Sequence, residues 1–163
     1  PLGPYFSFCC ICLLPKINPI QERIQKEAHF LFCLDVDMKF HQRWGAEALS
    51  QLVAAVQLSY YYESRDKFPY ERRPASLSFV PLNEGDFYYA GAVFGGTMEE
   101  IHKLTRTCQE HLDRDRVNGI EAAWQEEKDL NRYLIYNKPT WLLSSEYIYG
   151  TTEGVMMHLR SRS

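Results

Sequence analysis

The chain has 163 residues, of which 45% are hydrophobic, and its formal net charge is −3. This length can bury one ordinary hydrophobic core, so we expect a single domain rather than two. The slight excess of acidic residues, with no basic cluster longer than Arg72-Arg73, argues against a protein that binds nucleic acid.

The N-terminal segment carries an apolar run from Leu2 to Leu14. The run is too short for a membrane-spanning helix, which needs roughly 20 residues, and a signal peptide would begin with basic residues. Pro4 and Pro15 interrupt it, and it has no helical or strand period. We expect residues 1–19 to be unrelated to the domain that follows and to have no fold of their own.

A strand and a pair of aspartates come next. Residues 28–34 are almost continuously apolar, which is typical of a strand covered on both faces. Residues 20–26 are predicted to end a helix, so helix and strand alternate as in an α/β fold. The strand runs directly into Asp35-Val36-Asp37, and the carboxyl end of a buried strand is where α/β proteins bind ligands.

The aspartate pair has three interpretations. Two neighbouring carboxylates suit Mg²⁺ or Mn²⁺, whose coordination substrate phosphates usually complete. Aspartyl-phosphate hydrolases place a similar pair after a buried strand and use the first aspartate as a nucleophile, although Met38 departs from their pattern. Turn or helix-capping aspartates are the structural alternative.

Apolar patterns predict one helix and two strands in the middle of the chain. The helix spans residues 45–56, because its leucines and valines fall on one side. A short strand is predicted over 77–82. A second apolar strand is predicted over 87–94, and it leads into Gly95-Gly96.

Two helices follow. Thr97-Met98-Glu99-Glu100 matches the capping-box pattern of a helix start, and the residues after it form one apolar face. Residues 113–116 are expected to be a solvated, charged connector. The last helix is predicted to begin near Asn118 as its N-cap and to run to about Tyr133. A final short strand is predicted over 141–143.

Two further features could carry chemistry. Glu127 falls in the middle of the apolar face of the last helix, where a carboxylate is costly unless it is paired or lines a binding site. An exposed glutamate on a rotated helix is the alternative. Ala90-Gly91-Ala92 has small side chains that would let a ligand approach the backbone, and tight packing against a helix would explain them equally well.

These features, in this order, resemble the family 6 glycosyltransferases, and most closely the Forssman-type members of that family. The likeness covers about Gln21 to Tyr149. The matching segments are 32–38, 68–74, 84–89, 94–96, 118–124, 137–139 and 145–147.

The resemblance implies an α/β fold, the C-terminal portion of a GT-A-type nucleotide-sugar transferase fold whose upstream Rossmann-like units are missing. Residues 20–149 would then be a partial catalytic domain. Residues 1–19 would be unrelated to it, and residues 150–163 would be an unstructured tail. The resemblance also implies a Golgi location on the lumenal side of the membrane, through an anchor that these residues do not include.

The same resemblance implies a retaining α-1,3 transfer of GalNAc or Gal from a UDP-sugar donor to a glycolipid or oligosaccharide acceptor. Asp35 and Asp37 would bind Mn²⁺ beside the donor diphosphate, and Glu127 would be the catalytic carboxylate. The donor would contact Val36, Ala90, Gly91, Ala92 and Glu126. The acceptor would contact Gln57, Pro69 and Trp124.

Some residues depart from the family pattern. Gln57 stands where the family usually has a histidine, and Lys128 and Asp129 replace a serine and a histidine after the catalytic glutamate. Small residues at 90 and 92 around Gly91 resemble the GalNAc-using members. The alternative to an enzyme is a catalytically inactive remnant or pseudoenzyme that retains sugar or metal binding.

Overall fold

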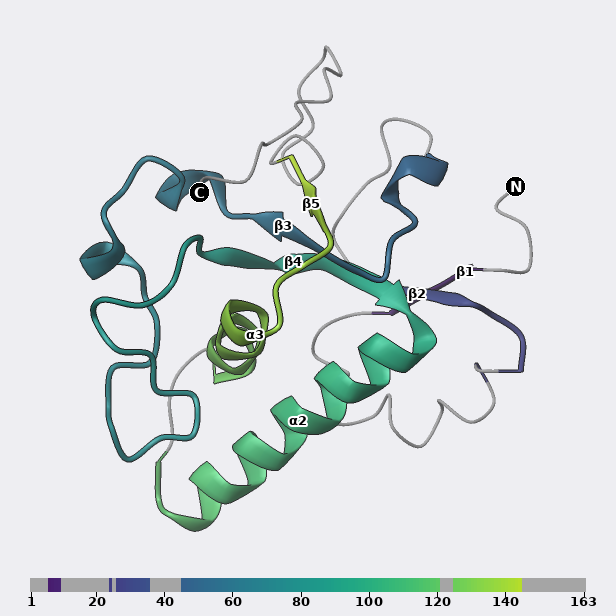
Figure 1. The fold of residues 1–163 in the computed structure, drawn as a ribbon. Helices are drawn as coiled ribbons and strands as arrows, with labels where there is room; N and C mark the ends of the chain where they lie inside the picture. The colour runs from purple at the N-terminus through teal and green to yellow at the C-terminus, as the bar shows by residue number, and fades with distance from the viewer. Residues whose placement is uncertain (1–5, 10–23, 25, 36–44, 121–124, 145–163) are drawn as a thin grey trace.

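The computed structural model describes residues 6–9, 24, 26–35, 45–120 and 125–144 (Figure 1). Five strands form one mixed sheet in the order β1-β2-β4-β3-β5. The strands are β1 (Phe6–Cys9), β2 (Phe30–Leu34), β3 (Leu52–Val56), β4 (Tyr89–Thr97) and β5 (Trp141–Leu143). Helices α2 (Met98–Val117) and α3 (Gln125–Tyr136) lie together on one side of the sheet (Figure 1). The described residues therefore form a mixed α/β fold, as the sequence predicts.

The strand β4 is the centre of the sheet. It pairs antiparallel with β2 on one side and with β3 on the other. The outer strands β1 and β5 pair parallel with β2 and β3, respectively. The sheet is therefore mixed: its inner pairs are antiparallel and its outer pairs are parallel.

Alternate residues of the inner strands supply two apolar clusters, one on each face of the sheet. In β2, Leu31 and Cys33 pack in the cluster that includes α2 and α3, whereas Phe32 and Leu34 belong to the cluster on the other face. Successive side chains of a strand point to opposite faces, so a strand covered on both sides must be apolar throughout. This explains the continuous apolar run that predicts β2.

Two glycines of β4 are explained by close packing. A Cβ atom on Gly95 would lie 2.2 Å from the Phe32 ring, and one on Gly96 would lie 2.2 Å from the Gln51 carbonyl oxygen. Both distances are far below van der Waals contact. The small side chains at these two positions therefore let β4 fit between its neighbouring strands.

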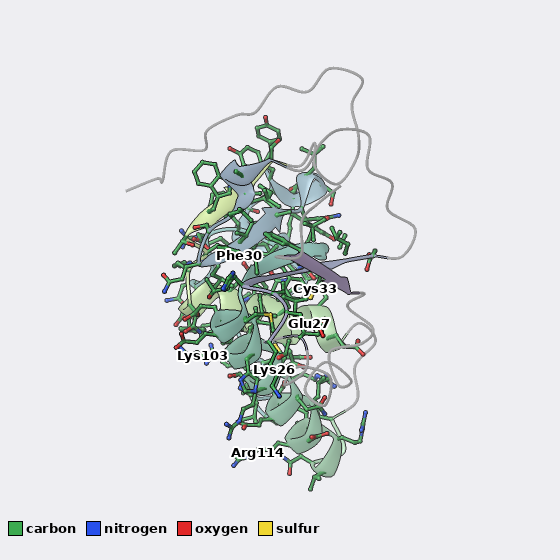
Figure 2. All side chains as sticks on the ribbon, turned by 90° about the vertical axis from the view of Figure 1, so that its right-hand side faces the viewer. Lys26, Glu27, Phe30, Cys33, Lys103 and Arg114 are labelled. Atoms are coloured by element: carbon green, nitrogen blue, oxygen red, sulfur yellow. The ribbon has the colours of Figure 1, made fainter. Side chains whose placement is uncertain are left out.

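Helix α2 begins where its capping signal places it. The Thr97 hydroxyl accepts a hydrogen bond from the Glu100 N–H at 3.4 Å, and Ile101, Leu104 and Cys108 are fully buried against the sheet. Cys33 is fully buried, whereas Lys103 and Arg114 are exposed on α2, and Figure 2 labels all three. The predicted cap and apolar face are confirmed.

The predicted helix over 45–56 is wrong. This stretch contains a single turn of 3₁₀-helix, η2 (Ala46–Ala48), followed by β3, whose five residues are all buried. A continuous apolar run is compatible with both a buried helix and a buried strand, so the sequence pattern alone does not distinguish them. Pairing with β4 and β5 decides for the strand.

Three predictions about the connections also need correction. Residues 77–82 form no strand, and only an isolated bridge joins Phe79 to Glu71. Residues 113–116 belong to α2 instead of a connector, and Asp115 is 1% exposed. Asn118 is the C-cap of α2, and α3 spans Gln125–Tyr136.

The two outer strands of the sheet are β1 and β5. Trp141–Leu143 forms the predicted final strand, β5. Four residues of the N-terminal segment, Phe6–Cys9, pair with β2 as β1, where the sequence predicts no strand. Among the helices of the described residues, none has both the length and the apolar character needed to cross a membrane.

Candidate active site

Glu127 lies in the first turn of α3 and faces the sheet. Its Oε1 accepts a hydrogen bond from the backbone N–H of Gly91 at 3.1 Å, and its side chain is half-buried. The alternative of an exposed glutamate on a rotated helix is therefore wrong, because Glu127 is half-buried and hydrogen-bonded to β4. The carboxylate binds Gly91, the middle residue of the small-residue segment 90–92 of β4, which the sequence singles out independently.

The pairing of β4 with β3 is irregular beside this contact. The partner of β4 in β3 changes from Ala54, opposite Phe94, to Ala55, opposite Ala90. One step along β3 thus corresponds to four steps along β4, so the intervening residues of β4 leave the regular β3 ladder. Bulges of this kind redirect backbone groups and are common beside active sites.

Asp35 reaches the same region from β2. Its backbone N–H donates to the carbonyl oxygen of Ala92 at 3.1 Å, and the residue is half-buried. Asp35 follows Leu34, the last residue of β2, directly. The main chain of β4 therefore links Asp35, through Ala92 and Gly91, to Glu127.

Tyr88 adds a phenol beside Glu127. Burial raises its pKa, and the charge of Glu127 and a hydrogen bond to it raise the pKa further. The phenol therefore stays protonated and donates to the carboxylate. Sequence reasoning missed this residue, since an aromatic residue at the start of a strand has no local signal that separates a site residue from a core residue.

Two predicted acceptor contacts, Gln57 and Pro69, lie near Tyr88. The N–H of Gln57, which follows β3, donates to the Tyr88 carbonyl at 2.9 Å, and Gln57 is half-buried. Pro69 is exposed between Phe68 and Tyr70, two buried residues whose rings lie 6.4 and 5.6 Å from that of Tyr88. Gln57 is thus linked to Glu127 through Tyr88, whereas Pro69 lies between two residues whose rings neighbour Tyr88.

The other predicted site residues divide into two groups. Ala90 is 1% exposed, Gly91 is buried and Ala92 is half-buried, whereas Glu126 is exposed on the first turn of α3. Val36, Asp37 and Trp124 lie outside the described residues.

Of the two predicted metal ligands, Asp35 lies within the described residues. Asp35 supplies a half-buried carboxylate at the carboxyl end of β2, and carboxylate oxygens are the ligands that Mg²⁺ and Mn²⁺ prefer. Within the described residues, no group of three or more His, Cys, Asp or Glu side chains is arranged to hold a metal ion. Asp35 fits such an ion as one ligand of a set.

The residues after Glu127 anchor α3 to the loop that contains residues 71–79. The Lys128 ammonium lies 3.2 Å from Oε2 of Glu71, which is 4% exposed. Arg73 also donates to Glu71 through its guanidinium and its backbone N–H. Arg73 first, and Lys128 in addition, hold the pKa of the Glu71 carboxyl at about 2 despite its burial. Lys128, which departs from the family pattern, therefore has a clear structural partner.

Asp129 makes the second anchor and is fully buried. It accepts a hydrogen bond from the Ser78 hydroxyl, and its Oδ1 lies 3.6 Å from Nδ1 of His111 on α2. Among the described residues, its Oδ2 has no hydrogen-bond partner. Burial raises the pKa of Asp129 to about 6, against the lowering effect of His111.

Glycosyltransferase family 6 matches residues 15–162. The chain therefore belongs to glycosyltransferase family 6. The match extends beyond residue 149, where the sequence resemblance places the end of the domain.

Individual relatives agree with this family. The chain is 50% identical over 130 residues to globoside alpha-1,3-N-acetylgalactosaminyltransferase 1 of Gallus gallus, covering 80% of this chain and 38% of that protein. It is 46% identical over 163 residues to the Homo sapiens protein of the same name, covering 91% of this chain and 47% of the relative.

A third relative has a different name. Histo-blood group ABO system transferase 1 of Rattus norvegicus is 48% identical over 129 residues, which cover 79% of this chain and 37% of that protein. The chain spans less than half the length of each of these three relatives.

Proposed function

We propose that this chain carries the catalytic carboxylate of a retaining α-1,3-glycosyltransferase that moves GalNAc from a UDP-sugar to a glycolipid or glycan ending in galactose or GalNAc. The observation that carries the proposal is the hydrogen bond from Gly91 N–H to Glu127 at 3.1 Å. Membership of glycosyltransferase family 6 and the names of the relatives support the reaction class.

Glu127 would act on the anomeric carbon of the donor sugar. A carboxylate stabilises an oxocarbenium-like centre electrostatically, or it bonds to that carbon and preserves the anomeric configuration through two inversions. The Gly91 N–H orients one oxygen of Glu127, and the neutral Tyr88 phenol donates to the same carboxylate. A fixed carboxylate requires little rearrangement when the charge on the sugar develops.

The segment Ala90-Gly91-Ala92 would select the donor sugar. Its side chains are the smallest available, and Ala92 is half-buried beside Asp35. Small residues leave space for the N-acetyl group of GalNAc, which Gal lacks. We therefore propose UDP-GalNAc as the preferred donor over UDP-Gal, with Glu126 as a further donor contact.

Asp35 and Asp37 would hold the metal ion, for which we propose Mn²⁺. When bound, such an ion neutralises negative charge on the departing diphosphate. The N–H of Asp35 binds the main chain of β4 at Ala92, next to Gly91, so the main chain of Asp35 is held close to the Glu127 contact.

The test is sugar transfer by the purified 163-residue chain in the presence of Mn²⁺. UDP-GalNAc and UDP-Gal are each offered with globoside and with fucosylated acceptors. We expect transfer from UDP-GalNAc to exceed that from UDP-Gal, and Glu127→Ala to lower turnover by about 10²–10³-fold, the cost of removing one group that stabilises the transition state. Asp35→Ala and Asp37→Ala should abolish the Mn²⁺ dependence.

Glu110→Gln is the matched control, because it changes an exposed glutamate on α2 and should leave turnover unchanged. Turnover that survives Glu127→Ala would reject the role of Glu127. Mn²⁺-dependent UDP binding without turnover would instead identify a binding-only protein. Absence of both would identify an inactive remnant of the family.

A further inference from the structure

Asn131 is a fully buried amide on the face of α3 that meets β4. Its Oδ1 accepts from the Tyr89 N–H at 2.8 Å, and its Nδ2 donates to the Tyr89 carbonyl at 2.9 Å. The same Nδ2 donates to the backbone carbonyl of Glu127 at 3.0 Å. One side chain therefore binds the strand and the first turn of the helix together.

The amide of Asn131 makes the two backbone hydrogen bonds with Tyr89 that a neighbouring strand would otherwise make. The last pair between β2 and β4 joins Leu34 to Val93, and Tyr89 lies four residues further along the chain towards the start of β4. Buried backbone N–H and C=O groups need hydrogen-bond partners, and Asn131 supplies both for Tyr89.

The spacing of the contacts matches the two elements. Glu127 binds Gly91, and Asn131 binds Tyr89, so helix residues i and i+4 contact strand residues that are two apart. Four residues of α-helix rise about 6 Å, and two residues of strand extend about 6.6 Å. Two hydrogen-bonding side chains on one helix face can therefore follow the strand without strain.

An apolar residue at position 131 would satisfy packing but not hydrogen bonding. Its neighbours Leu130 and Leu134 are fully buried in the apolar cluster beneath the sheet. A leucine there would leave the N–H and C=O of Tyr89 unpaired, which costs more than the bonds themselves contribute. The buried amide thus has a specific role beyond filling the core.

We propose that Asn131 is a positioning residue, which fixes the register of α3 against β4 and thereby holds the Glu127 carboxylate at Gly91. Its consequence for catalysis rests on the function proposed above, whereas its effect on the Glu127–Gly91 contact does not. Loss of the Asn131 contacts would let the first turn of α3 shift along β4. A shift of about 1 Å in a reacting group can lower a rate by about 10²-fold.

The first measurement is hydrogen exchange at the Gly91 and Tyr89 amides, followed by NMR on the 163-residue chain. Asn131→Asp keeps the shape of the side chain but removes the two donors, and Asn131→Leu removes all three hydrogen bonds. We expect exchange at Gly91 to become about tenfold faster in both variants, since local opening no longer breaks the Asn131 contacts.

Asn137→Ala is the matched control. Asn137 also donates to a carbonyl four residues earlier, that of Tyr133, but it lies beyond the C-terminal end of α3. We expect this variant to leave exchange at Gly91 unchanged. Equal acceleration in the Asn137 and Asn131 variants, or none in either Asn131 variant, would overturn the proposal.

The second measurement compares kcat and KM of the Asn131→Asp variant with those of the unmodified chain. If the chain turns over, Asn131→Asp should lower kcat by about 10- to 100-fold and change KM by less than about twofold. The same substitution in a Glu127→Gln chain should cause no further loss, because the positioned carboxylate is already absent. An equal loss in both backgrounds would show a general structural defect and reject the positioning role. If the unmodified chain has no turnover, the proposed function fails and the exchange of Gly91 decides the positioning role alone.

Discussion

The two ends of α2 contact the rest of the protein in different ways. Near its start, Ile101, Leu104 and Cys108 pack into the apolar cluster under the sheet. Near its end, Asp115 is equally buried but binds the Ser76 hydroxyl, and it accepts from the Leu77 N–H at 3.0 Å. The contact near the start depends on how much apolar surface and volume the side chains bury. The contact near the end depends on particular hydrogen-bond donors and acceptors.

This difference explains how the 71–79 loop is placed beside the candidate active site. Apolar packing tolerates many side chains of similar volume, whereas a buried carboxylate must meet its own partners. Asp115 and Asp129 bind the loop through Ser76 and Ser78, and Lys128 binds it through Glu71. The polar contacts therefore give the loop one position against α3, the helix that carries Glu127.

The largest expected effect on the free energy of unfolding comes from a substitution in the apolar contact near the start of α2. Leu104→Ala should lower the free energy of unfolding by about 2–5 kcal/mol, because it removes a fully buried side chain and leaves a cavity. Urea denaturation measures the change. Leu82→Ala is the control, because Leu82 is 67% exposed and should change stability by less than about 0.5 kcal/mol. Equal effects of the two variants would contradict the assignment of the core.

A pH effect should come from the buried polar contact between Asp129 of α3 and the 71–79 loop. The folded pKa of Asp129 is about 6, against 3.8 as its ordinary value. The folded state therefore holds this proton more tightly than the unfolded state, and the resulting stability is fully present below about pH 4 and lost as pH rises through about 6. The loss should be on the order of 3 kcal/mol. The charges that surround Asp129 are those of His111, Asp115 and Glu126.

Asp129→Asn isolates this contribution, since asparagine keeps the shape but does not titrate. Urea denaturation of both chains is repeated from pH 4 to pH 7. The difference in unfolding free energy between the parent chain and the variant should shrink as the pH rises. A constant difference across this range would show that Asp129 does not titrate there.

Cutting the link between α2 and the loop should have an intermediate effect. Asp115→Ala leaves the Ser76 hydroxyl and the Leu77 N–H without their acceptor, at a cost of about 1–3 kcal/mol. Asp113→Ala is the control, because Asp113 is an exposed aspartate in the same turn of α2. Limited proteolysis should also cleave the 71–79 loop faster in the Asp115 variant alone. Unchanged cleavage would mean that other contacts hold the loop.

The smallest effect is expected at an exposed ion pair on α2. Arg106 Nε lies 3.0 Å from Glu110 Oε1, and both side chains are largely exposed. Glu110→Gln should change the free energy of unfolding by less than about 0.5 kcal/mol. Thermal unfolding at low and high salt measures it. A change comparable to that of Asp115→Ala would show that exposure does not separate weak from strong polar contacts here.

The sequence predicts those parts of the fold whose signal is local. The apolar run of β2, the cap at Thr97 and the buried face of α2 are each visible within a few residues. The stretch that forms β3 fails, because five consecutive apolar residues fit a helix face and a central strand alike. Residues 113–116 fail because a charged sequence gives no sign that one of its aspartates will be buried.

The candidate site divides in the same way. Glu127 stands out because a carboxylate interrupts an apolar helix face. Asp35 stands out because it follows a buried strand. Tyr88 and Glu71 have no such local signal, since their roles depend on Glu127 and Lys128.

By itself, the sequence determined which residues could carry chemistry: Asp35 after a strand, the small residues 90–92, and Glu127 on a helix. The tertiary structure alone decided that Glu127 meets Gly91, 36 residues earlier, and that Asp129 meets Ser78, 51 residues earlier. The reason is physical. Periodicity and capping act within a few residues, whereas burial of a polar group is possible only where the folded chain brings a distant partner to it.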